Sequence, residues 1–251
     1  MSDDTADPAW TPSVSVVGLG DAGTETVDAV TTPTATTFAT VDGPDDAAAV
    51  AASVAADDFC YLTGDVSDPA VVDAAETILD ATEGHTSFFL EGTTDRPEPI
   101  VEGCDFLLPI DPDAAPPPDG RALVASAIVD CAEAMLRPTG QDLGYGDILL
   151  ATRSGRIGSL RVAAIGGLQH PLTDRVDVTD PDGVLHFLCG DETLSHTFAD
   201  VRGSRRSREY PDANEFLWDR RIHDRYGDPA HVKTITTVAA DADRRERLLR
   251  S

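Results

Sequence analysis

A glycine-rich turn follows the first apolar stretch of the chain and opens a helix pattern. Its glycines, Gly18, Gly20 and Gly23, have the spacing G-x-G-x-x-G. Such a turn directs backbone amides and a helix N-terminus towards a phosphate group. Asp42 ends the next strand pattern, 19 residues after Gly23, where dinucleotide-binding folds place an acid that contacts ribose. These residues predict a nucleotide site; the alternative is a tight strand–helix turn without a ligand.

Acidic residues lie in both loops that could contact phosphate. Asp21 lies within the glycine turn, where an unpaired carboxylate would repel an anion. The loop TGDVSDP, which begins with Thr63 and Gly64, follows the third strand pattern and offers a second place for a phosphate. It holds one glycine and two acids, so the alternative is a capped turn in which Ser67 or Asp68 starts a helix.

A second pair of acids lies near the middle of the chain. Asp142 and Asp147 flank glycines in the loop GQDLGYGD, where they could polarise a water molecule or hold a cation. Solvated loop carboxylates are the alternative. The 6 histidines show no ligand spacing, and the 4 cysteines form no CxxC motif, so no metal site is predicted. We expect the cysteines to be buried free thiols in a reducing compartment.

The charge balance is strongly acidic. The 251 residues include 45 Asp and Glu against 19 Lys and Arg, a formal net charge of -26, while 41% are hydrophobic. This composition indicates a globular protein adapted to a high-salt cytoplasm, where screening lengths fall to about 3 Å near 1 M salt. It argues against nucleic acid as a partner. The absence of a signal peptide and of a long apolar run predicts a cytoplasmic protein without membrane insertion.

The elements that must position these residues alternate between strand and helix patterns. Strands are predicted at 13–19, 35–42, 59–64, 86–92 and 104–110, and helices at 24–30, 47–56 and 69–82. Such alternation predicts an α/β fold with a Rossmann-like parallel sheet. Later strand patterns cover 148–153, 160–167, 184–190, 214–220 and 231–240, with a short helix at 193–201, and predict a smaller α+β unit.

A long helix pattern connects the two halves. Val124, Ala127, Ile128, Cys131, Met135 and Leu136 recur at three- and four-residue steps and predict one buried stripe. The expected organisation is an acidic arm (1–12), a nucleotide-binding-like α/β domain (13–118), the central helix with its loop (119–147), the C-terminal domain (148–240) and a charged tail (241–251).

With these residues in view, nearly the whole chain resembles the tubulin/FtsZ superfamily, nearer the FtsZ branch. VVGLGDAGTETVDAV is similar to the first glycine loop of FtsZ, and FCYLTG followed by PAVVDAAETIL resembles the strand and helix around its main phosphate loop. PDANEFLWDRRIHDRYGDPAHVKTITTVA resembles a pattern in the FtsZ C-terminal domain, and 119–147 resembles the central helix and the loop behind it.

The resemblance implies GTP, held with a Mg²⁺ or K⁺ ion at the C-terminal edge of the sheet. It also implies head-to-tail stacking, in which the loop after the central helix reaches the γ-phosphate of the next subunit. First-loop positions fall on Gly18, Gly20, Ala22 and Gly23, and the Asp of the second loop falls on Asp42. Asp147 matches the final acid of the catalytic loop.

The chain departs from the family pattern at its phosphate loops. Asp21 and Thr24 replace glycines, and the shorter, acidic GDVSDP stands where FtsZ has GGGTGTG. Further departures are Ile110 for an Asn, Ala122 for the guanine-contacting Asp, Asp142 for the catalytic-loop Asn and Gly144 for its first acid. Each charge-assisted hydrogen bond lost removes about 1.5–3 kcal/mol of nucleotide affinity.

These departures predict a shortened, divergent FtsZ-like protein with weak or lost GTP binding and hydrolysis, that is, a pseudo-GTPase. It would act in cell division or in the cytoskeleton by assembling with itself or with FtsZ-type subunits. Two alternatives stay open. An NAD(P)-binding oxidoreductase could be built on the glycine turn and Asp42, or a rewired pocket could bind GTP through amides of Thr63, Gly64 and Ser67, with Mg²⁺ or K⁺ bridging the acids.

Overall fold

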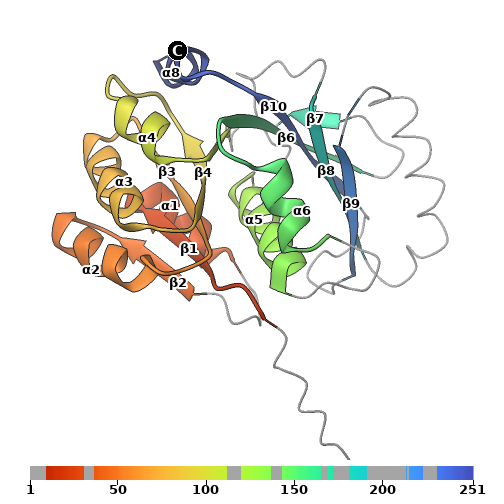
Figure 1. Cartoon of the computed structure of the whole chain (residues 1–251), viewed down its shortest axis with the longest axis horizontal. Coiled ribbons are helices and arrows are strands. Elements are labelled where there is room, and N and C mark those ends of the chain that lie inside the picture. The colour runs from red at the N-terminus through yellow and green to blue at the C-terminus, as the bar shows by residue number, and fades with distance from the viewer. Residues whose placement is uncertain are drawn as a thin grey trace, which may run out of the picture.

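One sheet runs through the whole molecule, with helices on both faces (Figure 1). The computed structural model describes residues 10–30, 37–111, 120–136, 143–164, 169–171, 181–190, 213, 215–222 and 231–250. Its strands follow the order β2-β1-β3-β4-β5-β6-β10-β8-β9, and β7 pairs with β6.

The first half is an alternating α/β unit with a parallel sheet. Its elements are β1 (Val14–Leu19), α1 (Gly20–Asp28), β2 (Thr37–Val41), α2 (Pro44–Val54), β3 (Phe59–Asp65), α3 (Pro69–Ala81), β4 (His85–Glu91), α4 (Glu98–Gly103) and β5 (Phe106–Pro109). Strands β1 to β5 pair in parallel. Strands covered on both faces read as continuous apolar runs, which is why the sequence predicted these strands within a few residues. It did not predict the short helix α4.

The second half adds antiparallel strands to the same sheet. Its elements are α5 (Gly120–Leu136), α6 (Tyr145–Ala151), β6 (Arg156–Ala164), β7 (Gln169–Pro171), β8 (Gly183–Gly190), β9 (Glu215–Ile222), β10 (His231–Ala239) and α8 (Ala242–Arg250). Strand β10 lies antiparallel between β6 and β8. The sheet is continuous because β6 pairs in parallel with β5. The α/β fold with a largely parallel N-terminal sheet is therefore confirmed.

Two predicted elements were wrong in type or position. Residues 148–153 were predicted as a strand, but they belong to α6 and the turn after it. The helix forms because Asp147 accepts a hydrogen bond from the Gly144 amide, and because Ile148 and Ala151 share one buried face. A short apolar run does not distinguish helix from strand by periodicity alone. Helix α1 begins at Gly20, earlier than predicted, and the helix predicted at 193–201 lies outside the described residues.

Two apolar clusters cover the two faces of the sheet. One joins α1, α5 and α6 to the sheet, and the other joins α2, α3, α4 and α8 to its opposite face. Helices α2, α3 and α4 lie side by side on that second face (Figure 1). The C-terminal helix α8 is fastened there by Arg245, whose guanidinium donates to the carbonyls of Val101 and Cys104 at the end of α4.

All four cysteines are buried free thiols, as the sequence predicted. Burial raises the pKa of Cys104 and of Cys131 to about 12, so both are protonated at neutral pH. None of the helices in the described ranges is long and apolar enough to cross a membrane.

Helix α5 is buried on nearly all sides, not on the single predicted stripe. Besides that stripe, Val129, Asp130 and Glu133 are buried. The Asp130 carboxylate accepts a hydrogen bond of 2.6 Å from Nζ of Lys233, on β10, and both side chains are fully inaccessible. Lys233 is the only lysine of the chain. This buried ion pair joins α5 to β10. If one partner were removed, the other charge would be left buried without compensation, which is strongly destabilising.

We expect Lys233→Met to lower the free energy of unfolding by about 3–5 kcal/mol, because it leaves the buried Asp130 carboxylate without its counter-charge. Urea unfolding in molar KCl measures this loss. The double variant Lys233→Met, Asp130→Leu should recover most of it, since it removes both charges. Equal losses in the single and double variants would contradict the importance of the pair.

His85 is a second buried titratable group, at the start of β4. Its Nε2 lies 3.1 Å from Oγ1 of Thr152 and its Nδ1 3.5 Å from Oδ2 of Asp105. Its ring centroid lies 4.5 Å from that of Phe59. Burial lowers the pKa of His85 from 6.5 to about 4, and the Asp105 carboxylate only partly opposes this shift. The imidazole is therefore neutral at pH 7.

Stability should fall as the pH drops from 6.5 towards 4, because the unfolded chain binds a proton that the folded chain excludes. We expect His85→Gln to remove about 2 kcal/mol from the difference in unfolding free energy between about pH 7 and pH 5. Thr152→Val is the control: it removes a partner of the ring but no titrating group, so it should lower stability equally at both values. An unchanged pH dependence in His85→Gln would contradict this assignment.

Candidate functional site

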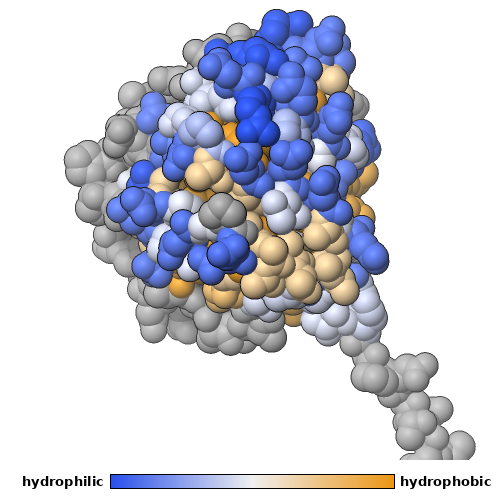
Figure 2. Space-filling model, turned by 90° about the vertical axis from the view of Figure 1, so that its left-hand side faces the viewer, coloured by the Kyte–Doolittle hydropathy of each residue, from blue (hydrophilic) through white to orange (hydrophobic). Residues whose placement is uncertain are grey.

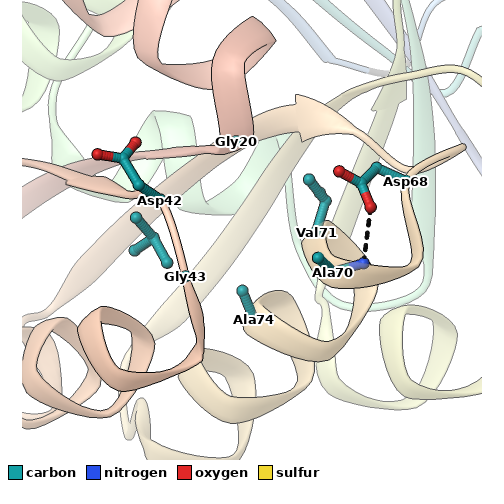
Figure 3. A pocket seen from close by; sticks show the side chains of 8 residues that line it. Gly20, Asp42, Gly43, Asp68, Ala70, Val71 and Ala74 are labelled. Carbon is teal, nitrogen blue, oxygen red and sulfur yellow. Dashed lines mark hydrogen bonds between the residues drawn. The ribbon is translucent and has the colours of Figure 1, made fainter.

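The candidate site lies at the C-terminal edge of the parallel strands, beside β1, which lies between β2 and β3. The chain moves from β1 to β2 on one side and returns to β3 on the other, which makes a topological switch point. A hollow of about 40 Å³ lies there, and its lining includes Gly20, Asp42, Asp68 and Val71 (Figure 3). Pockets that hold drug-sized ligands measure about 300–1,000 Å³. The hollow by itself is several times smaller than such pockets.

The glycines of the first turn serve close packing of the backbone. A Cβ added to Gly18 would lie 2.4 Å from the carbonyl oxygen of Gly23, and one added to Gly23 would lie 2.3 Å from that of Thr63. A Cβ on Gly64 would lie 2.7 Å from the carbonyl oxygen of Leu19. All five of these residues are buried. The contact of α1 with β1 and β3 thus requires these glycines even without a phosphate ligand.

Gly20 has a left-handed backbone and contacts α3. Its φ is +64°, a conformation that favours glycine, and an added Cβ would lie 2.9 Å from Cγ2 of Val71. Figure 3 shows Val71 and Ala74 of α3 facing the hollow below Gly20. The apolar first turns of α3 therefore occupy the side of the hollow opposite the glycine turn.

The loop between β3 and α3 satisfies its own backbone donors. Oδ1 of Asp65 accepts from the Ser67 amide at 2.9 Å, and Oδ1 of Asp68 accepts from the Ala70 amide at 2.9 Å (Figure 3). The other amides from 66 to 72 donate to carbonyls of Glu91, Asp65 and Asp68, and Pro69 has none to donate. Carboxylates of the chain thus occupy the helix N-terminus that would otherwise attract an anion.

Arg121, in the first turn of α5, binds across the same edge of the sheet. Its Nη1 and Nη2 donate to the two carboxylate oxygens of Glu91, the last residue of β4, at 2.5 and 3.1 Å. Nη1 also donates to the carbonyl oxygen of Ala22 at 3.1 Å, and Nε lies 3.1 Å from Oε2 of Glu25. The guanidinium therefore joins α5, β4 and α1. The sequence analysis predicted neither Arg121 nor Glu91 as a site residue. The one available signal was Glu91 itself, an acid at the end of a predicted strand.

Asp42 and Asp21 are exposed at this edge. Asp42 follows β2 and stands at one end of the hollow, while Asp68 stands at the other (Figure 3). The structure thus places Gly20, Asp42 and the loop after Gly64 at one edge of the sheet. The carboxylates of Asp42 and Asp68 line the hollow there, and the described residues contain no cluster suited to a metal ion.

Asp147 lies at the opposite edge of the sheet. It caps the start of α6 through the 3.0 Å bond from the Gly144 amide. The neighbouring Tyr145 packs on Trp10, before β1, with ring centroids 5.2 Å apart, and its pKa is raised by burial and by Asp58, before β3. Trp10 and Asp58 each precede a parallel strand, so Tyr145 and the start of α6 lie at the N-terminal edge of the sheet. Asp147 and the glycine turn are therefore not brought together within one copy, and Asp142 lies outside the described residues.

The arrangement defines an α/β protein with a switch-point site and a central helix that leads to a second half of mixed parallel and antiparallel strands. No protein-family model matches the sequence, and no curated protein matches it. Solved structures do. FtsZ from M. jannaschii, described as an empty dimer, is similar with a TM-score of 0.69 and 14% identity over 91% of this chain and 89% of that chain.

CetZ and TubZ structures share the fold as well. CetZ1 from Haloferax volcanii, a GDP-bound monomer, has a TM-score of 0.56 and 10% identity over 94% of this chain and 98% of that chain. TubZ of Bacillus thuringiensis serovar israelensis, in GDP-form protofilaments, has a TM-score of 0.59 and 10% identity over 94% and 89%. The chain thus has the tubulin/FtsZ-superfamily fold, as the resemblance implied.

We expect Asp68→Ala to lower the free energy of unfolding by about 1 kcal/mol, because it removes the side-chain acceptor at the start of α3. Asp68→Asn is the matched control, since Asn caps helices about as well as Asp. Urea unfolding in molar KCl compares the three proteins. An equal loss in both variants would show that charge, not capping, is the contribution of Asp68.

Proposed function

We propose that this protein is a tubulin/FtsZ-like cytoskeletal or cell-division protein that binds GTP weakly or not at all. The observation that supports this proposal best is the loop after β3. Every amide from 66 to 72 already donates within the chain, and the acceptors include the carboxylates of Asp65 and Asp68. A phosphate would have to displace these bonds and approach like charges.

The residues present do not fit a nucleotide as they stand. The glycine turn is closed by packing, the hollow is small, and Arg121 bridges α5 to α1. Carboxylates of Asp42 and Asp68 line the hollow, and no basic side chain is among its lining residues. The alternative of a rewired GTP pocket would need the Ser67 amide, which already donates to Asp65.

End-to-end assembly is the part of the family behaviour that this geometry favours. The glycine turn and Asp147 lie at opposite edges of the sheet, so the two could meet only between copies stacked in line. Similar structures are described as an FtsZ dimer, a CetZ2 protofilament with GTPγS and TubZ protofilaments. We propose that this chain stacks on itself or on FtsZ-type subunits through these two edges, and that Asp147 acts there as a helix cap without chemistry.

Binding and turnover of GTP by the purified protein, in molar KCl with Mg²⁺ and over a range of protein concentrations, test this proposal. We expect no binding at millimolar GTP, and assembly measured by light scattering that is equal with and without nucleotide. Asp147→Asn is the control, and it should behave as the parent protein. Turnover that rises steeply with protein concentration and is lost in Asp147→Asn would overturn the proposal and make Asp147 a catalytic residue.

A further inference from the structure

A second hollow borders the loop between β3 and α3. Its volume is about 490 Å³, and the loop that follows β4 and the end of α8 complete its lining. It has no lining residue in common with the hollow of about 40 Å³ beside the glycine turn. Pockets for small molecules measure about 300–1,000 Å³, so this second hollow has the size of a ligand site.

The walls of this hollow are held by hydrogen bonds between segments that are distant in sequence. The Val66 amide donates to the carbonyl oxygen of Glu91 at 3.0 Å, and the Thr94 amide donates to that of Leu249 at 2.7 Å. Gly92, with a left-handed φ of +68°, lets the chain turn at the end of β4. The loop after β4 is thus joined to the β3–α3 loop on one side and to α8 on the other, so the hollow is formed without a ligand.

The charged side chains of the lining are two arginines, Arg96 and Arg250, and one acid, Asp95. This excess of positive charge contrasts with the net charge of -26 of the whole chain. It also contrasts with the hollow beside the glycine turn, where the charged lining residues are Asp42 and Asp68. The charge of the larger hollow therefore favours an anionic group.

Neighbouring carboxylates position both guanidinium groups without using all of their donors. Arg96 donates from Nη1 and Nη2 to Asp73 and Glu76 of α3, at 2.5 and 3.4 Å. Arg250 donates to Glu98 of α4 and to the backbone carbonyl before Arg96, both at 2.9 Å. A guanidinium has five N–H donors, and Nε of neither arginine donates within the described ranges. Each arginine therefore keeps donors for an acceptor in the hollow.

Hydroxyl groups and an apolar floor complete the lining. Val66 and Val72 are buried beneath the hollow, and the hydroxyls of Ser67 and Thr93 make no hydrogen bond to another described residue. On the side that carries α2 and α3, hydrophilic residues gather at the end where α4 and α8 lie, and hydrophobic ones at the end where α2 lies (Figure 2). A few polar groups over apolar side chains are typical of small-molecule sites.

We propose that this hollow binds a small molecule that carries a carboxylate or phosphate group beside an apolar part. Arg96 and Arg250 bind the oxyanion, because a guanidinium matches the geometry of either group with paired hydrogen bonds. Val66 and Val72 contact the apolar part. The surrounding acids repel an anion only at long range in dilute salt; in molar salt this repulsion is screened beyond about 3 Å, whereas direct hydrogen bonds remain.

Ligand-observed NMR in molar KCl tests the site with phenyl phosphate and with benzoate, and phenol is the matched probe without an oxyanion. We expect one or both anions to bind at least tenfold more tightly than phenol, and their comparison distinguishes a phosphate site from a carboxylate site. Failure of both anions to bind at millimolar concentration, or equal binding of phenol, would overturn the proposal. The probes contain no nucleotide and the measurement requires no assembly, so the inference does not depend on the proposed function.

Variants locate the binding in this hollow. The double variant Arg96→Gln, Arg250→Gln should raise the dissociation constant of the bound anion at least tenfold. Arg244→Gln, Arg247→Gln is the control, since it removes the same charge from residues that do not line the hollow, and it should bind as the parent does. Equal affinity in both double variants would contradict the assignment.

Thr93→Val tests the hollow without changing charge. Its hydroxyl makes no hydrogen bond to another described residue, so this variant should unfold in urea as the parent protein does. We expect the dissociation constant of the bound anion to rise about two- to tenfold, because one hydrogen bond to the ligand is lost. An unchanged dissociation constant in Thr93→Val, together with an unchanged one in Arg96→Gln, Arg250→Gln, would place the anion elsewhere.

Discussion

Helix α5 is held at two points by ion pairs, one partly exposed and one fully buried, and both halves of the molecule contact it. At its first turn Arg121 binds Glu91 and the carbonyl of Ala22, at the edge of the candidate site. Nine residues later Asp130 binds Lys233 beneath the C-terminal strands. Between these points its apolar side chains cover the sheet. Because a buried charge is costly without its partner, the Asp130–Lys233 pair opposes any shift of α5 relative to β10.

The candidate site illustrates how a ligand-binding edge can be stabilised without a ligand. A helix N-terminus and a glycine turn present donors that a phosphate would otherwise satisfy. In the loop before α3, the carboxylates of Asp65 and Asp68 accept hydrogen bonds from the amides of Ser67 and Ala70. A loop of this kind gains little from an anion, because binding would exchange existing hydrogen bonds for new ones.

Charge is distributed unevenly over the structure. In the described ranges most acidic side chains are exposed or half-buried, whereas the inaccessible Asp130 and the buried Glu91 have cationic partners. Salt screens interactions between exposed charges much more than interactions between buried ones. The buried ion pairs therefore depend less on the salt concentration than the acidic surface does.

Local patterns in the sequence determined the alternating elements of the first half, the buried thiols and the central helix. These features depend on periodicity and composition over short stretches, which a single chain displays directly. Pairings between distant residues were decided only by the tertiary structure. Asp130 and Lys233 are 103 residues apart, and Arg121 and Glu91 are 30 apart, so no local pattern joins them. The same holds for the glycines: their spacing predicted a phosphate, but only the folded chain shows that backbone atoms of Gly23 and Thr63 already fill the space beside them.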